Sequence, residues 1–163
     1  MNVKRILFPT DFSHCNDAAL EYVSTLAAES GAVLYIVHVD EWANVSTAMG
    51  EPAYLCPPGW DLDGRREVRK RLTNVIPSVA SAHYEHHYLA GSPVREILKF
   101  AEREHVDLIV MASHGRTGLA RLLMGSIAEG VMRGAKCPVI VVKQPAIQRA
   151  PSKRCEPQAA ETG

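Results

Sequence analysis

The chain has 163 residues, and 18 Lys and Arg balance 18 Asp and Glu, so its formal net charge at pH 7 is zero. This length suits one compact domain and is short for two. A zero net charge gives no reason to expect binding to nucleic acid or to an anionic membrane, so we expect neither partner. No apolar run approaches the roughly 18 residues of a membrane span, and residues 6–8 are too short a run for a signal peptide, so we expect a cytoplasmic protein.

Short apolar runs, rich in β-branched residues, recur along the chain at residues 6–8, 33–39, 108–111 and 139–142. They are apolar at successive positions, which is typical of strands buried on both faces, as in a parallel sheet. A fifth, more polar run at residues 84–89 predicts a strand at the sheet edge.

Helical patterns separate these strands. An apolar stripe with i, i+4 spacing covers residues 18–27, with Ser13 as the expected N-cap and Gly31 as the expected end. Residues 41–62 contain three prolines and two glycines and predict a long loop. A charged helix is expected to follow over residues 63–78.

Two further helices are predicted in the second half of the chain. Ser92 and Pro93 fit the N-cap and first positions of a helix ending near His105, and Ser126 is expected to cap the last helix. Alternating strands and helices predict a doubly wound sheet. We expect one domain over residues 1–144 and a disordered tail over residues 145–163.

The carboxyl ends of the strands should form the ligand site of such a sheet. Gly115 and Gly125 can take positive φ and bring the backbone close to a ligand, and a helix start after Gly125 favours phosphate. The Asp11 carboxylate suits ribose hydroxyls instead. Turns that only close the fold would explain the same glycines, and neither a P-loop nor a G-x-G-x-x-G fingerprint is present.

A longer pattern is more specific. A-S-H-G at residues 112–115, then nine residues, then G-S resembles the G-x-x-G, nine residues, G-[ST] signature of the nucleotide-binding branch of the universal stress protein family. ILFPTDFS (residues 6–13), IVHV (36–39) and CPVIVV (137–142) resemble the same family in the same order, over about residues 3–143.

This resemblance implies a Rossmann-like α/β fold with five parallel strands in the order 3-2-1-4-5 and helices on both faces. It also implies a homodimer through the last strand and an ATP site, with Mg²⁺ held mainly by the phosphates. Carried over by position, the nucleotide-binding residues would be Pro9, Thr10, Asp11, Val39, Ala112, His114, Gly115, Arg116, Gly125, Ser126 and Ile127.

The resemblance also assigns roles. Asp11 would meet the ribose, and the backbone of Val39 would read the adenine edge. Residues 112 and 115 would line the ribose and phosphates, and residues 125–127 would bind the phosphates. The implied function is a nucleotide-dependent stress-response or signalling module. The alternative is an interaction scaffold with a vestigial site, because Ala112 stands where the family pattern has glycine.

Other candidate chemistries carry less weight. His38, Ser113 and His114 lack a G-x-S-x-G elbow, and no Walker-type lysine is present, so we assign no catalytic residue and leave slow ATP hydrolysis open. His83, Glu85 and His87 would share one face of a strand, where they could be metal ligands. We interpret this strand instead as a solvated edge that binds no metal, and we assign no role to the histidine cluster that includes His86.

The cysteines and the remaining basic residues are not assigned to the site. The four cysteines, with no C-x-x-C pair among them, are expected to be reduced thiols. The basic run at residues 65–71 is expected to be a solvated face or a partner surface. Arg121, between the two glycine turns, is expected to keep its loop soluble, and the alternative is that it neutralises a triphosphate.

Overall fold

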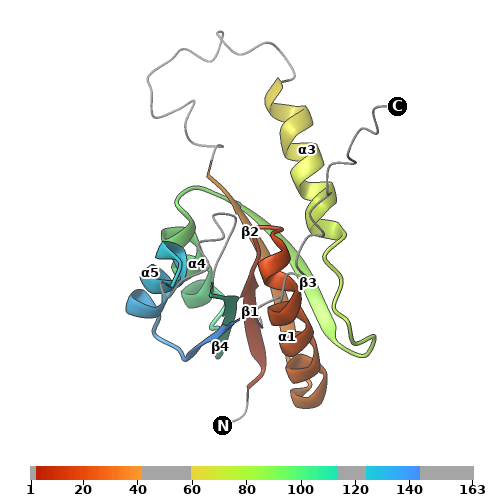
Figure 1. The fold of residues 1–163 in the computed structure, drawn as a ribbon, viewed down its shortest axis with the longest axis vertical. Helices are drawn as coiled ribbons and strands as arrows, with labels where there is room; N and C mark the ends of the chain where they lie inside the picture. The colour runs from red at the N-terminus through yellow and green to blue at the C-terminus, as the bar shows by residue number, and fades with distance from the viewer. Residues whose placement is uncertain (1–2, 42–59, 114–123, 144–163) are drawn as a thin grey trace, which may run out of the picture.

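A computed structural model describes residues 3–41, 60–113 and 124–143 of the chain. It contains five strands: β1 (Arg5–Pro9), β2 (Val33–Asp40), β3 (His83–Ala90), β4 (Leu108–Ala112) and β5 (Val139–Val142). Its helices are η1 (His14–Asn16), α1 (Asp17–Ser30), α3 (Trp60–Thr73), α4 (Pro93–Arg103) and α5 (Ser126–Gly134). The strands alternate with the helices along the chain (Figure 1).

All strand pairs are parallel, and the strand order is β3-β2-β1-β4-β5. This confirms the predicted sheet, including the polar strand β3 at one edge. β1 lies at the centre, where the order reverses between β2 and β4. In Figure 1, α1 and α3 lie on one side of the sheet and α4 and α5 on the other.

Alternate residues of each strand enter two separate cores. Ile6 and Phe8 pack with α1 in one core, whereas Leu7 between them packs with α4 and α5 in the other. All three side chains are fully buried. This explains why the strands are apolar at successive positions.

Helix boundaries differ from the predictions in three places. Ser13 precedes the short helix η1 instead of capping α1, which begins at Asp17 after Asn16. Ser126 is the first residue of α5, and Gly125 is the N-cap. α3 begins at Trp60, inside the stretch that we expected to be a loop, and ends at Thr73, five residues earlier than predicted (Thr73 against residue 78).

The early end of α3 has a local cause. Pro77 restricts the residue before it to extended backbone, so the helix cannot continue through Ile76. Hydrogen bonds from Asn74 to the Arg71 carbonyl and from Val75 to the Leu72 carbonyl close the last turn. Ile76 is consequently 59% exposed, although its spacing had suggested an apolar helix face. By contrast, Gly31 ends α1 as predicted, in the left-handed conformation.

Candidate functional site

The carboxyl edge of the sheet gathers the ends of β1, β2 and β4 with the start of α5. The Thr10 N–H donates to the Val37 carbonyl at 2.8 Å, which ties the end of β1 to β2. The Ser113 N–H donates to the Val142 carbonyl at 2.9 Å, and the Gly125 N–H donates to the Ser113 carbonyl at 2.8 Å. The segments that sequence predicted to meet therefore lie on one edge, at the point where strand order reverses.

Asp11 is fixed by its own turn. Its Oδ1 accepts hydrogen bonds from the Ser13 N–H at 3.0 Å and the Ser13 hydroxyl at 2.6 Å, and a third from the Asn16 amide. These bonds make an Asx turn, which holds the carboxylate in one orientation. Asn16, a contact that sequence reasoning missed, is itself buried.

His38 lies beneath this turn and is 7% exposed. Its Nδ1 is 2.7 Å from the Thr10 carbonyl, which can only accept, so Nδ1 carries a proton. Its ring stacks on that of Phe12 with 4.2 Å between centroids. His38 thus supports the end of β1, and this role fits a positioning group better than a catalytic base.

Ala112 ends β4 and pairs with Val142 of β5. Among the described residues other than glycine, only Phe12 and His105 have positive φ, so Ala112 adopts an ordinary strand conformation. The alanine in place of glycine therefore strains no backbone in this structure. Ala112 is 9% exposed and belongs to the core at the edge of the site.

The start of α5 forms the other wall. Gly125 has φ −59° and ψ 144°, so the expected positive φ is wrong at this position. Ser126 and Ile127 are exposed, and they occupy the first turn, where backbone N–H groups have no partner within the helix. This turn carries the positive end of the helix dipole and suits an anion.

Several predicted positions lie outside the described residues: His114, Gly115, Arg116 and Arg121, together with Cys56, Cys155 and residues 42–59 of the expected loop. The remaining predicted site residues, from Pro9 to Asp11 and at Val39, lie at the carboxyl ends of β1 and β2. Cys137 is a free thiol, and burial raises its pKa.

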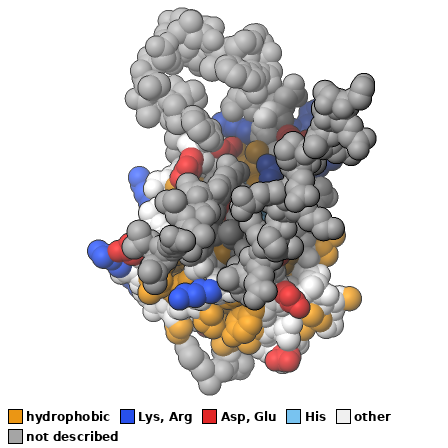
Figure 2. Space-filling view, viewed as in Figure 1, with side chains coloured by type: hydrophobic (Ala, Val, Ile, Leu, Met, Phe, Trp, Pro, Cys, Tyr) orange, Lys and Arg blue, Asp and Glu red, His pale blue; other side chains and the backbone are white. Residues whose placement is uncertain are grey.

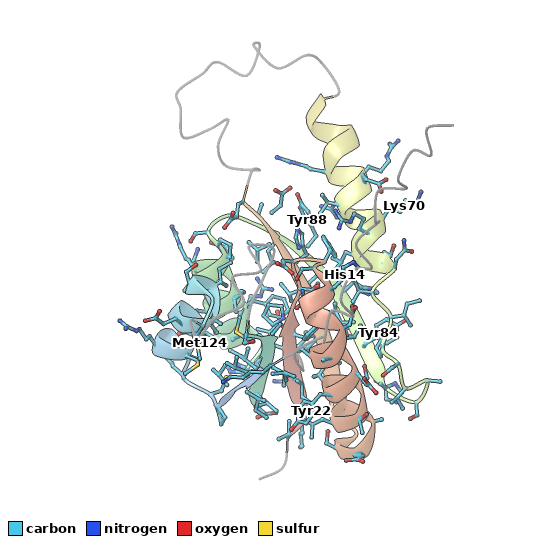
Figure 3. The ribbon with its side chains drawn as sticks, viewed as in Figure 1. His14, Tyr22, Lys70, Tyr84, Tyr88 and Met124 are labelled. Carbon is cyan, nitrogen blue, oxygen red and sulfur yellow. The ribbon has the colours of Figure 1, made fainter. Side chains whose placement is uncertain are left out.

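A second polar cluster at this edge was not predicted. The Tyr88 hydroxyl donates to Asp40 Oδ2 at 2.6 Å, and the Arg69 guanidinium lies 4.4 Å from the Tyr88 ring centroid. Figure 3 shows Tyr88 next to α3 at this end of the molecule. Tyr88 and Asp40 are far apart in the sequence, with α3 between them, so no local sequence pattern predicts their contact.

The histidines of β3 are divided between the two faces of the sheet. His87 Nε2 lies 3.2 Å from Glu85 Oε2, whereas His86 Nε2 lies 2.8 Å from the Val75 carbonyl. Within residues 3–41, 60–113 and 124–143, no three His, Cys, Asp or Glu side chains are arranged to hold a metal ion. In the same ranges, no helix is long and apolar enough to cross a membrane.

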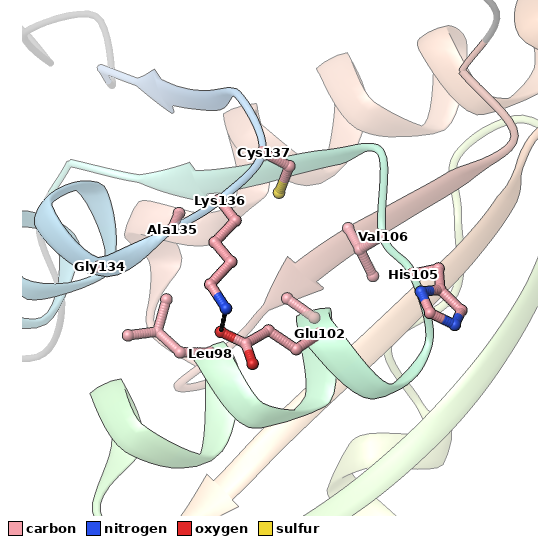
Figure 4. Close-up of a pocket in the computed structure, with 9 residues that line it drawn as sticks. Leu98, Glu102, His105, Val106, Gly134, Ala135, Lys136 and Cys137 are labelled. Carbon is pink, nitrogen blue, oxygen red and sulfur yellow. Dashed lines mark ion pairs between the residues drawn. The ribbon is translucent and has the colours of Figure 1, made fainter.

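A groove of about 470 Å³ lies at the opposite end of the molecule (Figure 4). It is lined by residues just before β4 and β5, including Val106 and Cys137, and the Lys136 ammonium lies 3.1 Å from the Glu102 carboxylate. Because it opens at the amino ends of the strands, this groove is separate from the candidate site.

Known proteins are similar to this chain in sequence and architecture. Universal stress protein MJ0531 of Methanocaldococcus jannaschii is 37% identical over 149 residues, which cover 87% of this chain and 83% of that protein. The structure of hypothetical protein MJ0577, from the same organism, matches with a TM-score of 0.73 at 29% identity, over 89% of this chain and 99% of the other.

A third match is a universal stress protein from Archaeoglobus fulgidus in complex with dAMP, with a TM-score of 0.59 at 20% identity, over 88% of this chain and 100% of the other. At this identity the likeness shows the fold alone. The model of the universal stress protein family matches residues 2–143 of this chain. The chain therefore belongs to the universal stress protein family.

Proposed function

We propose that this protein binds ATP at the carboxyl edge of its sheet and serves as a nucleotide-dependent stress-response or signalling module. One observation carries the proposal: the fixed Asp11 carboxylate and the start of α5, whose first-turn N–H groups suit an anion, flank the same reversal of strand order. A ribose and its phosphates need these two kinds of group side by side.

The roles of Asp11 and of the start of α5 follow from their chemistry, and the role of Val39 follows from the family resemblance. The Asp11 carboxylate is the ribose acceptor, and the backbone of Val39 at the end of β2 reads the adenine edge. The first-turn amides of α5 receive the phosphates. The family match and the dAMP complex of a family member support an adenine nucleotide as the ligand.

Mg²⁺ would be held chiefly by oxygen atoms of the phosphates. Magnesium commonly binds through substrate phosphates with one or two protein carboxylates at most. The ion would offset the negative charge of the triphosphate.

We further propose that the protein is a cytoplasmic homodimer paired through β5. This strand lies at the sheet edge, and all four of its apolar side chains are only partly buried. Pro138 and Val142 direct their carbonyls to β4, so the alternating groups of Val139 and Val141 face the open edge. Exposed apolar edges are usually paired or protected.

The dimer can be tested at Val141. Proline there removes one outward N–H and leaves the β4 ladder intact, so Val141→Pro should give a monomer by sedimentation velocity. Val141→Ala keeps the N–H and should remain dimeric. A dimer that survives Val141→Pro would exclude pairing through this strand.

The nucleotide site is tested by isothermal titration of nucleotide-stripped protein with ATP and Mg²⁺. Valine at position 125 is compatible with φ −59°, and its branched side chain should block phosphate approach. Gly64→Val is a matched control, because a Cβ at Gly64 meets no atom within 4 Å. We expect micromolar binding that Gly125→Val abolishes and Gly64→Val retains. No binding by the folded wild-type protein would leave the interaction scaffold as the function.

A further inference from the structure

Phe12 lies in the turn that follows β1, between the ribose acceptor Asp11 and Ser13. Its φ of 62° is in the left-handed region, which a bulky side chain adopts only when the surroundings hold it there. The Phe12 N–H donates to the Thr10 hydroxyl at 3.1 Å. The conformation of this residue therefore sets the direction of the turn that presents Asp11.

Two side chains hold the Phe12 ring. The His38 imidazole stacks on it, with an interplanar angle of 30°. The Arg71 guanidinium carbon lies 4.7 Å from its centroid, which is within the range of a cation–π contact. His38 is anchored in turn to the Thr10 carbonyl. Arg71 comes from α3, so a distant helix fastens the turn.

The same helix makes a second contact of this kind. Arg69 lies over the ring of Tyr88, and the Tyr88 hydroxyl binds Asp40, the residue after Val39. The two arginines therefore reach the ribose turn and the base-reading end of β2. Arg69 and Arg71 are exposed to solvent and also lie over aromatic rings, and Figure 2 shows Lys and Arg side chains at this end of the molecule.

α3 is anchored to the body of the protein beside the Arg71 contact. Leu72, next to Arg71, is 3% exposed and belongs to the core on the α1 side of the sheet. Arg66 lies on the same helix and is exposed, and within the described part of the chain it makes no hydrogen bond, ion pair or ring contact. It provides an internal control for charge.

We propose that Arg71 is a positioning residue of the nucleotide site, which acts through Phe12 to hold the Asp11 turn in place for the ribose, and that Arg69 supports the base-reading end of β2 through Tyr88. The inference rests on the proposed ATP site. It differs from direct phosphate recognition, because the guanidinium of Arg71 acts on a protein ring and not on the ligand.

The first test needs no ligand. Amide hydrogen exchange, measured by NMR for the Phe12 and Ser13 N–H groups, should be about two- to fivefold faster in Arg71→Ala, the range expected for loss of one exposed cation–π contact. Arg66→Ala should match the wild-type protein, and Arg71→Lys, which retains a cation, should recover part of the protection. Equal exchange in Arg71→Ala and Arg66→Ala would overturn the inference.

The second test measures Kd for adenosine, ATP and dideoxy-ATP, which lacks both ribose hydroxyls. Arg71→Ala should weaken adenosine and ATP by the same factor, about two- to fivefold. The affinity gained from the ribose hydroxyls should shrink in Arg71→Ala and stay unchanged in Arg66→Ala. Weakening of ATP alone would indicate a direct phosphate contact and overturn the positioning role.

The two tests separate this inference from the function on which it rests. If the wild-type protein binds no nucleotide, the proposed function fails, and the ligand part of the inference fails with it. If the wild-type protein binds ATP and the Arg71 and Arg66 variants behave alike, only the positioning role fails.

Discussion

The Tyr88 hydroxyl donates a hydrogen bond of 2.6 Å to Asp40 Oδ2 across the β2–β3 pair. Burial, and after it the hydrogen bond and the charge of Asp40, raise the pKa of Tyr88 to about 12, against an ordinary value of about 10. The folded protein thus holds this proton more tightly than the unfolded chain. The resulting stability is fully present below about pH 10 and is lost as pH rises through about 12.

Tyr88→Phe removes this pH-dependent contribution. Between about pH 10 and about pH 12 the wild-type protein should lose more stability than the variant, although it should be the more stable of the two near neutral pH. Urea unfolding across this range checks the difference, and tyrosinate absorbance follows the ionisation directly. Parallel stability curves for the two proteins would contradict the link between Tyr88 and Asp40.

Replacing glycine with alanine should lower the stability of the fold at Gly31 and raise it at Gly64. A Cβ would meet no atom within 4 Å at either position, so only the backbone decides. Gly31 has φ 67°, and Gly31→Ala should cost about 1 kcal/mol through left-handed strain, net of the entropy that alanine removes from the unfolded chain. Gly64 is exposed within α3, and Gly64→Ala should add about 0.5–1 kcal/mol. Chemical denaturation measures both, and equal signs would show that the helix boundaries are misplaced.

Two glycines of α5 allow this helix to pack closely on α4. A Cβ at Gly130 would lie 2.8 Å from Val94 Cγ2, and a Cβ at Gly134 would lie 2.5 Å from Leu98 Cδ1. Valine is stiff at χ1 in a helix, whereas the end of the leucine side chain can rotate towards the groove that it lines. We expect Gly130→Ala to destabilise the fold by about 1–2 kcal/mol, from overpacking partly offset by helix propensity.

Gly134→Ala is the matched comparison for Gly130→Ala. Despite the shorter distance, its cost should stay below about 1 kcal/mol, because Leu98 can move. Thermal unfolding of the two variants ranks them. A larger loss for Gly134→Ala would show that Leu98 is held as rigidly as Val94.

The strands could be predicted from sequence because a strand buried on both faces needs an unbroken run of apolar residues. A run such as residues 108–111 must be apolar at every position, since its members enter different cores. The helix ends were harder to predict. The apolar spacing suggested that α3 includes Ile76, but Pro77 keeps the backbone of Ile76 out of the helix. The glycine-bearing turns located the site edge, but the reason given for Gly125 was wrong, since its φ is negative.

The residues that hold the site in place left little signal in the sequence. Asn16 sits close to Asp11 in sequence, and an Asx turn could have been suspected from the D-x-S spacing. Arg71 and Phe12 are brought together only by the packing of α3, so neither residue carries a local signal for the contact. Tertiary contacts of this kind depend on the whole fold.

Ala112 decides between the nucleotide site and the vestigial scaffold. If the site required positive φ at this position, alanine would be strained by about 1–2 kcal/mol, and Ala112→Gly would tighten ATP binding about 5- to 30-fold. The strand conformation of Ala112, paired with Val142, argues against such a requirement. Ala112→Gly should therefore change the Kd for ATP less than about threefold, while losing about 1 kcal/mol of stability from glycine in a strand. Titration calorimetry and urea unfolding of one preparation measure both quantities, and a gain of affinity of tenfold or more would show that alanine impairs the site.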